Sequence, residues 1–171
     1  MTRYIFANCI AAGPINWKSP LTAEGQPEIA QAAMIGMDSK DESFHLEMTE
    51  PNAFNLNVYS DLIGAGAIVV GHSVEYHHGH FRATMIPMGI DPCDGRVQTI
   101  CTMLALTGHV EKRNGRKGWP TFDEACDHFG VTRAGTESAQ DNARCLMAVF
   151  AAMQRAGIEP TVRTWKERNS A

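Results

Sequence analysis

Apolar residues fall into short runs that predict three strands in the first half of the chain. Residues 3–10 combine aromatic and branched side chains and run into Gly13 and Pro14, which predicts a buried strand. Residues 44–48 alternate apolar with polar positions, and residues 67–71 place four apolar residues before a glycine, so both are expected to be strands. Residues 28–37 are rich in alanine, and their periodicity allows either a helix or a strand.

Helical spacing is more frequent in the second half. Residues 55–63 and 76–88 are expected to be helices, and residues 97–106 a strand or a helix. Residues 121–129 begin with Thr121 and carry Glu124 three positions later, the pattern of an N-terminal capping box. Residues 137–156 repeat apolar side chains at helical spacing up to Gly157 and form the last predicted helix. Strands followed by alternating strands and helices predict an α/β fold with a mixed sheet.

Length and composition fit one folded domain. The chain has 171 residues, of which 44% are hydrophobic and 20% charged, and it shows no internal repeat or linker-like segment. Its longest apolar run, residues 65–70, is far too short to cross a bilayer, and the first residues lack the long apolar run of a signal peptide. Five cysteines without a C-x-x-C pair indicate reduced thiols, so we expect a cytoplasmic protein with no membrane partner.

The charge of the chain limits how it could bind nucleic acid. A formal net charge of −4 excludes a strong overall attraction to nucleic acid but allows a local basic patch. Two groups of basic residues lie beside a tryptophan: Lys112, Arg113, Arg116 and Lys117 with Trp119, and Arg163, Lys166 and Arg168 with Trp165. Such groups suit single-stranded nucleic acid through phosphate contacts and base stacking. A solvated loop and a frayed terminus are the alternative interpretation.

Three segments occur in an order and spacing typical of one enzyme family. They are YIFANCIAAG at residues 4–13, VVGHSVEYHHGHFR at residues 69–82 and ESAQDNARCLMAVFAAM at residues 137–153. They resemble the three motifs of the DnaQ-like 3′–5′ exonucleases of the DEDDh group: D-x-E after an apolar strand, GHN followed by an Asp, and H-x4-D-A on the last helix. Residues 119–130 also resemble the helix before the third motif. The resemblance covers residues 3–158.

The resemblance implies an RNase H-like fold, a mixed five-stranded sheet flanked by helices. We therefore expect a degenerate exonuclease-like domain over residues 1–158 and a polar, basic tail over residues 159–171.

The catalytic positions of the family are all replaced in this chain. Family members hold two divalent metals with four acids and use a histidine as general base. The acid positions carry Asn8, Ile10, His77 and Asn142, and the general-base position carries Glu137. Ser73 stands where the GHN motif has its asparagine. The apolar frame of the family is thus present without an intact catalytic residue.

These replacements predict that the paired magnesium site is absent. Two divalent ions about 4 Å apart repel by roughly 16 kcal/mol at an effective dielectric of about 20, and carboxylates offset that repulsion. Asn8 and Asn142 are neutral, Ile10 has no donor, and an imidazole suits zinc better than magnesium. We expect no cofactor, with His77 and Glu137 as polar fillers of the vacated cleft. The alternative is a transition metal held by His77, Glu137 and either His80 or Asp141.

The second motif is rich in histidine. His77 and His78 point apart on a helix, so surface and capping roles are expected for the group His72, His77, His78 and His80. His72 and Ser73 are kept as candidate contacts to nucleic acid. Cys9 falls on a predicted buried strand and is expected to be an inert core residue.

Three functional hypotheses follow. The first is a catalytically degenerate exonuclease-like domain that binds single-stranded nucleic acid or a protein of nucleic-acid metabolism. The second is an active 3′–5′ exonuclease with a rearranged metal site, which alone would require Mg²⁺ or Mn²⁺. The third is a structural or inhibitory subunit. By resemblance, the chain could also form a homodimer.

Overall fold

A mixed sheet forms the centre of the molecule. The computed structural model describes residues 3–19, 25–38, 43–48, 51–93, 95–115, 118–134 and 138–165, with the backbone alone at residues 38 and 43–48. The strands are β1 Arg3–Ala11, β2 Ile29–Asp38, β3 Ser43–Met48, β4 Ile68–Gly71, β5 Gln98–Cys101 and β6 Arg163–Thr164. They lie in the order β3-β2-β1-β4-β5-β6. Strands β1, β4 and β5 are parallel, and the others are antiparallel to their neighbours. The predicted mixed five-stranded sheet is confirmed, and β6 extends it.

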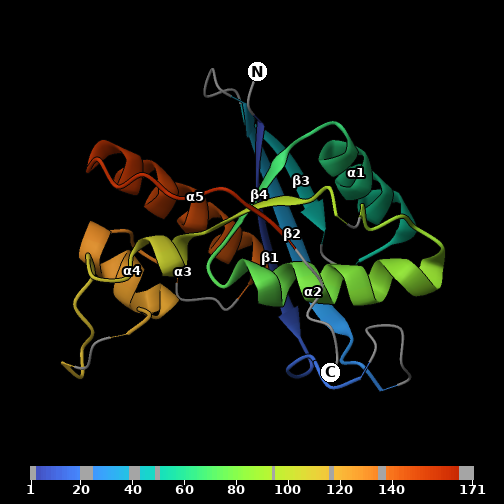
Figure 1. The fold of residues 1–171 in the computed structure, drawn as a ribbon, viewed down its shortest axis with the longest axis horizontal. Helices are drawn as coiled ribbons and strands as arrows, with labels where there is room; N and C mark the ends of the chain where they lie inside the picture. The colour runs from blue at the N-terminus through green and yellow to red at the C-terminus, as the bar shows by residue number, and fades with distance from the viewer. Residues whose placement is uncertain are drawn as a thin grey trace.

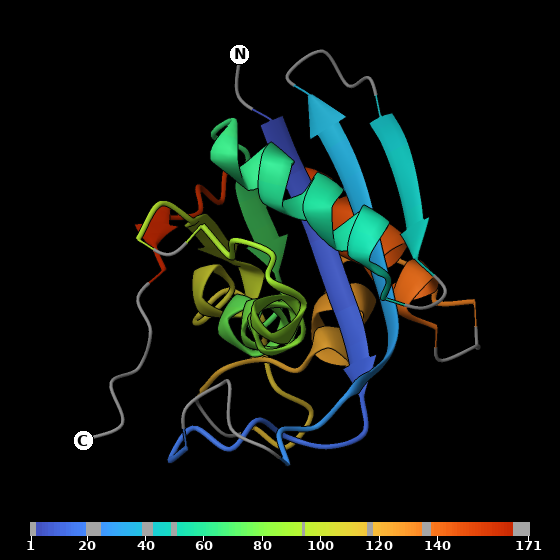
Figure 2. The ribbon, with the colours of Figure 1, turned by 90° about the vertical axis from the view of Figure 1, so that its right-hand side faces the viewer.

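Helices cover both faces of this sheet. They are α1 Ala53–Gly64, α2 Val74–Met85 with the 3-10 turn η1 Ile86–Met88, α3 Thr102–Ala105, α4 Phe122–Phe129 and α5 Ala139–Arg155. Helices α1 and α2 lie on one side, and α5 lies on the other with α3 and α4 beside it (Figures 1 and 2). The predicted capping box is present, because Thr121 accepts from the backbone of Glu124 and the Glu124 carboxylate accepts from the backbone of Thr121.

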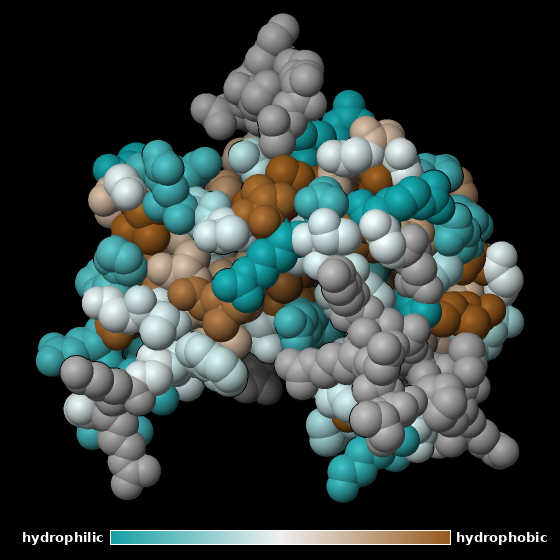
Figure 3. Space-filling view, in the orientation of Figure 1, coloured by the Kyte–Doolittle hydropathy of each residue, from teal (hydrophilic) through white to brown (hydrophobic). Residues whose placement is uncertain are grey.

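Strand β1 is buried on both faces, which explains why most of its residues are apolar. Alternate side chains of a strand point to opposite faces. Accordingly Ile5, Ala7 and Cys9 pack in the core under α1 and α2, whereas Phe6 packs under α5, with its ring 5.4 Å from that of Phe150. The face shown in Figure 3 carries hydrophobic residues only in small groups separated by hydrophilic ones. Among the described residues, no helix combines the length and apolar character needed to span a membrane.

The two segments whose periodicity left a choice both contain a strand. Residues 29–38 form β2, whose Ala32 and Met34 face one core and whose Ala33 and Ile35 face the other. A segment buried on both faces shows no alternation, so its composition resembles that of a buried helix. Residues 97–106 contain β5 followed directly by α3, and no breaker separates the two.

Part of the expected polar tail belongs to the packed fold. Thr99 and Gln98 of β5 pair with Arg163 and Thr164 of β6, and the backbone N–H of Trp165 donates to the carbonyl of Val97 at 2.8 Å. Only 4% of Trp165 is exposed. Its ring lies edge-on to His78, with centroids 4.8 Å apart, and under the guanidinium of Arg82 at 5.4 Å. Residues 166–171 lie outside the described residues.

We expect Trp165→Ala to lower the free energy of unfolding by about 3–5 kcal/mol, because it empties a large buried site. Urea unfolding followed by circular dichroism measures this loss. The neighbouring Val162, which is 45% exposed, provides the control, since Val162→Ala should change stability by less than about 0.5 kcal/mol. Equal stability of the two variants would show that the C-terminal segment does not contribute to the core.

Candidate functional site

A pocket of about 310 Å³ lies at the carboxyl ends of β1 and β4. Its walls are formed by Asn8, Cys9, His72, His77, Thr121, Phe122, Asp123, Arg133 and Asn142. Three of these residues, Asn8, His77 and Asn142, occupy acid positions of the exonuclease motifs. The fold therefore brings together residues from three distant segments, as the resemblance implied. Glu137, at the expected general-base position, lies outside the described residues.

The first motif places Asn8 at the centre of the pocket. Asn8 is 6% exposed and lies on the face of β1 that meets α5, where Nδ2 of Asn142 donates to its Oδ1 at 3.5 Å. Ile10 follows on the same face, since alternate residues share a face, and packs against the core beneath α5. The two positions of the D-x-E motif therefore lie on the same face of β1. The first carries an amide and the second a hydrocarbon side chain.

His77 reaches this amide from α2. The Nδ2 of Asn8 lies 3.4 Å from Nε2 of His77, and the backbone N–H of Cys9 donates to Nδ1 of the same ring at 3.2 Å. The Cys9 thiol lies 3.4 Å from Nδ1. A neutral imidazole has one N–H and one lone pair, so it can accept from only one of these two N–H donors.

Burial keeps both His77 and Cys9 uncharged. Desolvation, with the nearby His80 as a second cause, lowers the pKa of His77 to about 4. Desolvation raises the pKa of the Cys9 thiol to about 12. At neutral pH the pair is an imidazole and a thiol, not an imidazolium and a thiolate, so it lacks an activated nucleophile. The expectation that Cys9 is an inert core residue agrees with this.

The donors of the pocket do not fit two divalent metal ions. Asn8 and Asn142 are neutral amides already in contact with each other, and both ring nitrogens of His77 face N–H groups. Among the described residues, no group of three or more His, Cys, Asp or Glu side chains is arranged to hold a metal ion. Magnesium requires several hard oxygen ligands, and these amides supply no negative charge to offset that of the ions.

The glycine, histidine and serine of the second motif have structural roles. A Cβ on Gly71 would lie 2.8 Å from the backbone of Val74, so only glycine fits. His72 lies between Oγ1 of Thr102 at 3.0 Å and the carbonyl of Pro120 at 2.9 Å, which ties the end of β4 to the loop before α4. Ser73 adopts φ 66, a left-handed conformation that asparagine tolerates better than serine. Gly71, His72 and Ser73 therefore shape the end of β4 beside the pocket.

The expectation of surface and capping roles for the histidines is wrong. His72, His77, His78 and His80 are all buried, at 9%, 8%, 0% and 0% exposure. The reason is that α2 packs against β1 on one side and against Trp165 on another, as the ring contact of His78 shows. His72 lines the pocket, but both of its ring nitrogens are engaged by protein atoms.

Arg133 is a residue of the site that sequence reasoning missed. Its guanidinium forms an ion pair with Asp123, donates through Nη2 to Oδ1 of Asn142 at 2.8 Å, and lies 5.6 Å from the ring centroid of Phe122. Its side chain is 31% exposed. Arg133 belongs to no family motif, and its only signal was its place between the last two predicted helices.

Acidic side chains of α4 neutralise part of the positive charge of the candidate basic loop. Arg113 forms an ion pair with Asp127, and its backbone N–H donates to the buried Glu124 at 2.9 Å. Lys112 is half-buried, while Trp119 is 61% exposed and immediately precedes the residue that His72 binds. Arg116 and Lys117 lie outside the described residues.

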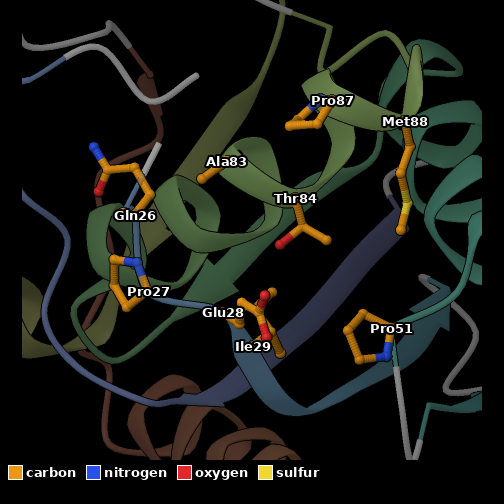
Figure 4. A pocket seen from close by; sticks show the side chains of 10 residues that line it. Gln26, Pro27, Glu28, Ile29, Pro51, Ala83, Thr84, Pro87 and Met88 are labelled. Atoms are coloured by element: carbon orange, nitrogen blue, oxygen red, sulfur yellow. The ribbon is translucent and has the colours of Figure 1, made fainter. Parts of the chain in front are cut away.

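A second pocket, of about 370 Å³, lies apart from these residues (Figure 4). It lies between the start of β2 and the end of α2, with Pro27 and Ile29 on one side and Ala83, Thr84 and Pro87 on the other. None of the residues predicted from the sequence lines it, so the pocket around Asn8 is the candidate site.

Solved nuclease structures share this fold, whereas no protein-family model and no curated protein matches the sequence. The nuclease domain of 3′hExo, a DEDDh family member solved with rAMP, has a TM-score of 0.62 at 8% identity, over 94% of this chain and 96% of that one. Cell-death related nuclease 4 has a TM-score of 0.61 at 15% identity, over 95% and 67%. Exonuclease I of E. coli, solved with a dT13 oligonucleotide, has a TM-score of 0.58 at 12% identity, and this chain spans 43% of its length. The fold is therefore that of the DEDDh 3′–5′ exonucleases, as the sequence motifs implied.

Proposed function

We propose that this chain binds single-stranded nucleic acid at the pocket around Asn8 and does not hydrolyse it. The observation that carries the proposal is the exchange of acids for amides and an imidazole at Asn8, His77 and Asn142 within a cleft that is still open. Carboxylates only accept hydrogen bonds and repel phosphate, so they need metal ions between them and a substrate. Amide N–H groups can contact phosphate directly.

The fold neighbours support the choice of ligand. Exonuclease I of E. coli was solved with single-stranded oligonucleotides, and the nuclease domain of 3′hExo with rAMP. A chain with the same fold and an open cleft at the corresponding motif residues is suited to the same class of ligand.

Trp119 supplies a surface on which a base could stack. Its ring is 61% exposed, and Thr121, two residues later, lines the pocket. Stacking of a base on an aromatic ring contributes about 1–3 kcal/mol and tolerates any sequence. Because Arg113 and Arg133 are paired with Asp127 and Asp123, the affinity should depend less on salt than that of a basic protein.

The test is a titration of 5′-fluorescein-labelled (dT)20 and (rU)20, followed by fluorescence anisotropy in EDTA and again in Mg²⁺. We expect binding in both buffers and intact oligonucleotides on a denaturing gel after prolonged incubation. Trp119→Ala should weaken binding about tenfold. Phe54→Ala removes an aromatic ring that is 73% exposed on α1 and should leave binding unchanged.

Two outcomes would contradict the proposal. Shortened products that require Mg²⁺ or Mn²⁺ and disappear in His77→Asn would indicate an active exonuclease with a rearranged metal site. No binding of either oligonucleotide would favour a protein partner instead.

A further inference from the structure

The second pocket, between the start of β2 and the end of α2, has largely apolar walls. Its volume of about 370 Å³ is near the lower end of the range of about 300–1,000 Å³ that is usual for small-molecule sites. The walls include Pro27, Ile29, Pro51, Pro87 and Met88. Figure 4 shows Pro51 and Met88 at one end of the pocket and Pro27 at the other. The walls therefore suit a small ligand with a hydrocarbon chain.

Two oxygen atoms of α2 at this pocket are hydrogen-bond acceptors. The hydroxyl of Thr84 donates its hydrogen to the carbonyl of His80 at 3.0 Å, so its oxygen can only accept from a ligand. The carbonyl of Ala83 lies four residues before Pro87. Because proline has no N–H, this carbonyl lacks the donor that the next turn of a helix normally supplies. Ala83, Thr84 and Pro87 all line the pocket.

The amide of Gln26 is bonded to the adjoining loop. Its Oε1 accepts from the backbone N–H of Asn16, and its Nε2 donates to the carbonyl of the same residue, both at 3.1 Å. One N–H of this amide is therefore already used within the protein. The side chains that line the pocket thus offer a ligand more acceptors than donors.

Glu28 adds a negative charge to these acceptors. Its side chain lines the pocket and is exposed. Among the described residues it forms no ion pair, and none of those that line the pocket is Lys, Arg or His. Arg82, which precedes Ala83 on α2, is buried and lies over the ring of Trp165. A cation that neutralises Glu28 within the pocket therefore has to come from the ligand.

We infer that this pocket binds a primary amine carried on a hydrocarbon chain. An alkyl amine resembles that of lysine, whose pKa is about 10.4, so at neutral pH it carries a positive charge and three N–H donors. Glu28 and Thr84, which lie on facing sides of the pocket in Figure 4, can accept from this group, and the carbonyl of Ala83 adds a third acceptor. The proline and methionine side chains contact the hydrocarbon.

The same groups disfavour other small ligands. A carboxylate would meet the like charge of Glu28, and an alcohol would bind without a charge to attract. The inference does not depend on the proposed function, because the pocket around Asn8 and this one share no residue.

The test is a titration of ¹⁵N-labelled protein with hexylamine, hexan-1-ol and hexanoate, followed by the NMR signals of the backbone amides of Glu28, Ile29 and Thr84. We expect hexylamine to give saturable shifts with a Kd in the millimolar range, as suits so small a ligand. Hexan-1-ol should bind about tenfold more weakly, because it lacks the charge-assisted hydrogen bond. Hexanoate should cause no shift.

A fourth probe identifies the source of the amine. Nα-acetyl-lysine methylamide carries the same ammonium group on a lysine side chain. Affinity equal to that of hexylamine would show that the pocket accepts a lysine of a protein, and much weaker binding would show that it selects a free amine. Both results support the inference.

Variants separate recognition of the amine from folding. Glu28→Gln should weaken hexylamine binding about tenfold and leave that of hexan-1-ol unchanged, which also shows that the pocket is intact. Thr84→Val removes the accepting oxygen but keeps the shape and should weaken hexylamine binding several-fold, whereas Thr84→Ser should restore it. Glu159→Gln is the matched control, since it neutralises an exposed carboxylate outside this pocket.

Three outcomes would overturn the inference. Equal affinity for hexylamine and hexan-1-ol would show that the pocket recognises only the hydrocarbon. Unchanged binding of hexylamine by Glu28→Gln would show that the carboxylate does not hold the amine. The absence of saturable shifts at Glu28, Ile29 and Thr84 would show that hexylamine does not enter the pocket. None of these results bears on the binding of oligonucleotides at Asn8, which the anisotropy titration measures separately.

Discussion

Restoring carboxylates at the four replaced acid positions should make the stability of this protein depend on Mn²⁺, whereas that of the natural chain does not. The substitutions are Asn8→Asp, Ile10→Glu, His77→Asp and Asn142→Asp. Four carboxylates around one cleft repel each other, so the metal-free variant should be less stable than the natural chain. Mn²⁺ at one hundred times its dissociation constant should return about 2.7 kcal/mol per site. Thermal unfolding in EDTA and in increasing Mn²⁺ measures both effects.

Arg133 provides an internal check on this experiment. Its guanidinium already contacts residue 142, and it should compete with a metal ion for a carboxylate placed there. Adding Arg133→Gln to the four substitutions should therefore enlarge the Mn²⁺-dependent gain. The melting temperature of the natural chain could instead rise in Mn²⁺ as much as that of the restored variant. This result would show that the cleft binds metal even with amides at positions 8 and 142.

Strand β1 was predictable from its sequence, because a strand that is buried on both faces is mostly apolar. Most of residues 3–10 are apolar on both faces because β1 lies between two cores, and D-x-E spacing correctly placed Asn8 and Ile10 on one face of that strand. The short strand β6 was not predictable. Its sequence is polar, its two residues are exposed, and its position is fixed by Trp165, whose partners His78 and Arg82 are more than eighty residues away in sequence.

The candidate site was only partly predictable: the sequence indicated the motif residues but not Arg133. Motif spacing indicates which residues approach each other when the family's fold is present, and Asn8, His77 and Asn142 do meet. It does not indicate what fills the space that the metal ions would occupy. Arg133 comes from the segment between α4 and α5, and its direction is set by contacts with Asp123 and Phe122 that no local pattern records.

The same limit explains why the burial of the four histidines at residues 72–80 was not predicted. Helical spacing shows which side chains share a face, but α2 is covered on more than one face, so residues that point apart are all buried. Burial of neutral imidazoles makes the fold sensitive to acid, and His77 is one of these buried groups.

Acidification should destabilise the protein between pH 6.5 and pH 4 through His77. Its pKa is about 4 in the folded chain, against 6.5 for an ordinary histidine, because of burial and of His80 nearby. In this window the unfolded state binds a proton that the folded state does not, so the stability is complete above pH 6.5 and falls as the pH falls towards 4. A shift of this size corresponds to about 2–3 kcal/mol at pH 4.5. Burial also lowers the pKa values of His72 and His80, which act in the same direction.

Urea unfolding at pH values from 7.5 to 4.5 can separate this residue from the others. His77→Asn keeps an oxygen near the place of Nδ1 that can accept from Cys9, and it cannot take up a proton. The variant should therefore lose about 2–3 kcal/mol less than the natural chain over this range. His109→Asn, which replaces an exposed histidine, is the control variant. If His77→Asn kept the full pH dependence, the ring of His77 would have to accept its proton while folded. Its contacts with the N–H groups of Asn8 and Cys9 would then have to open in acid.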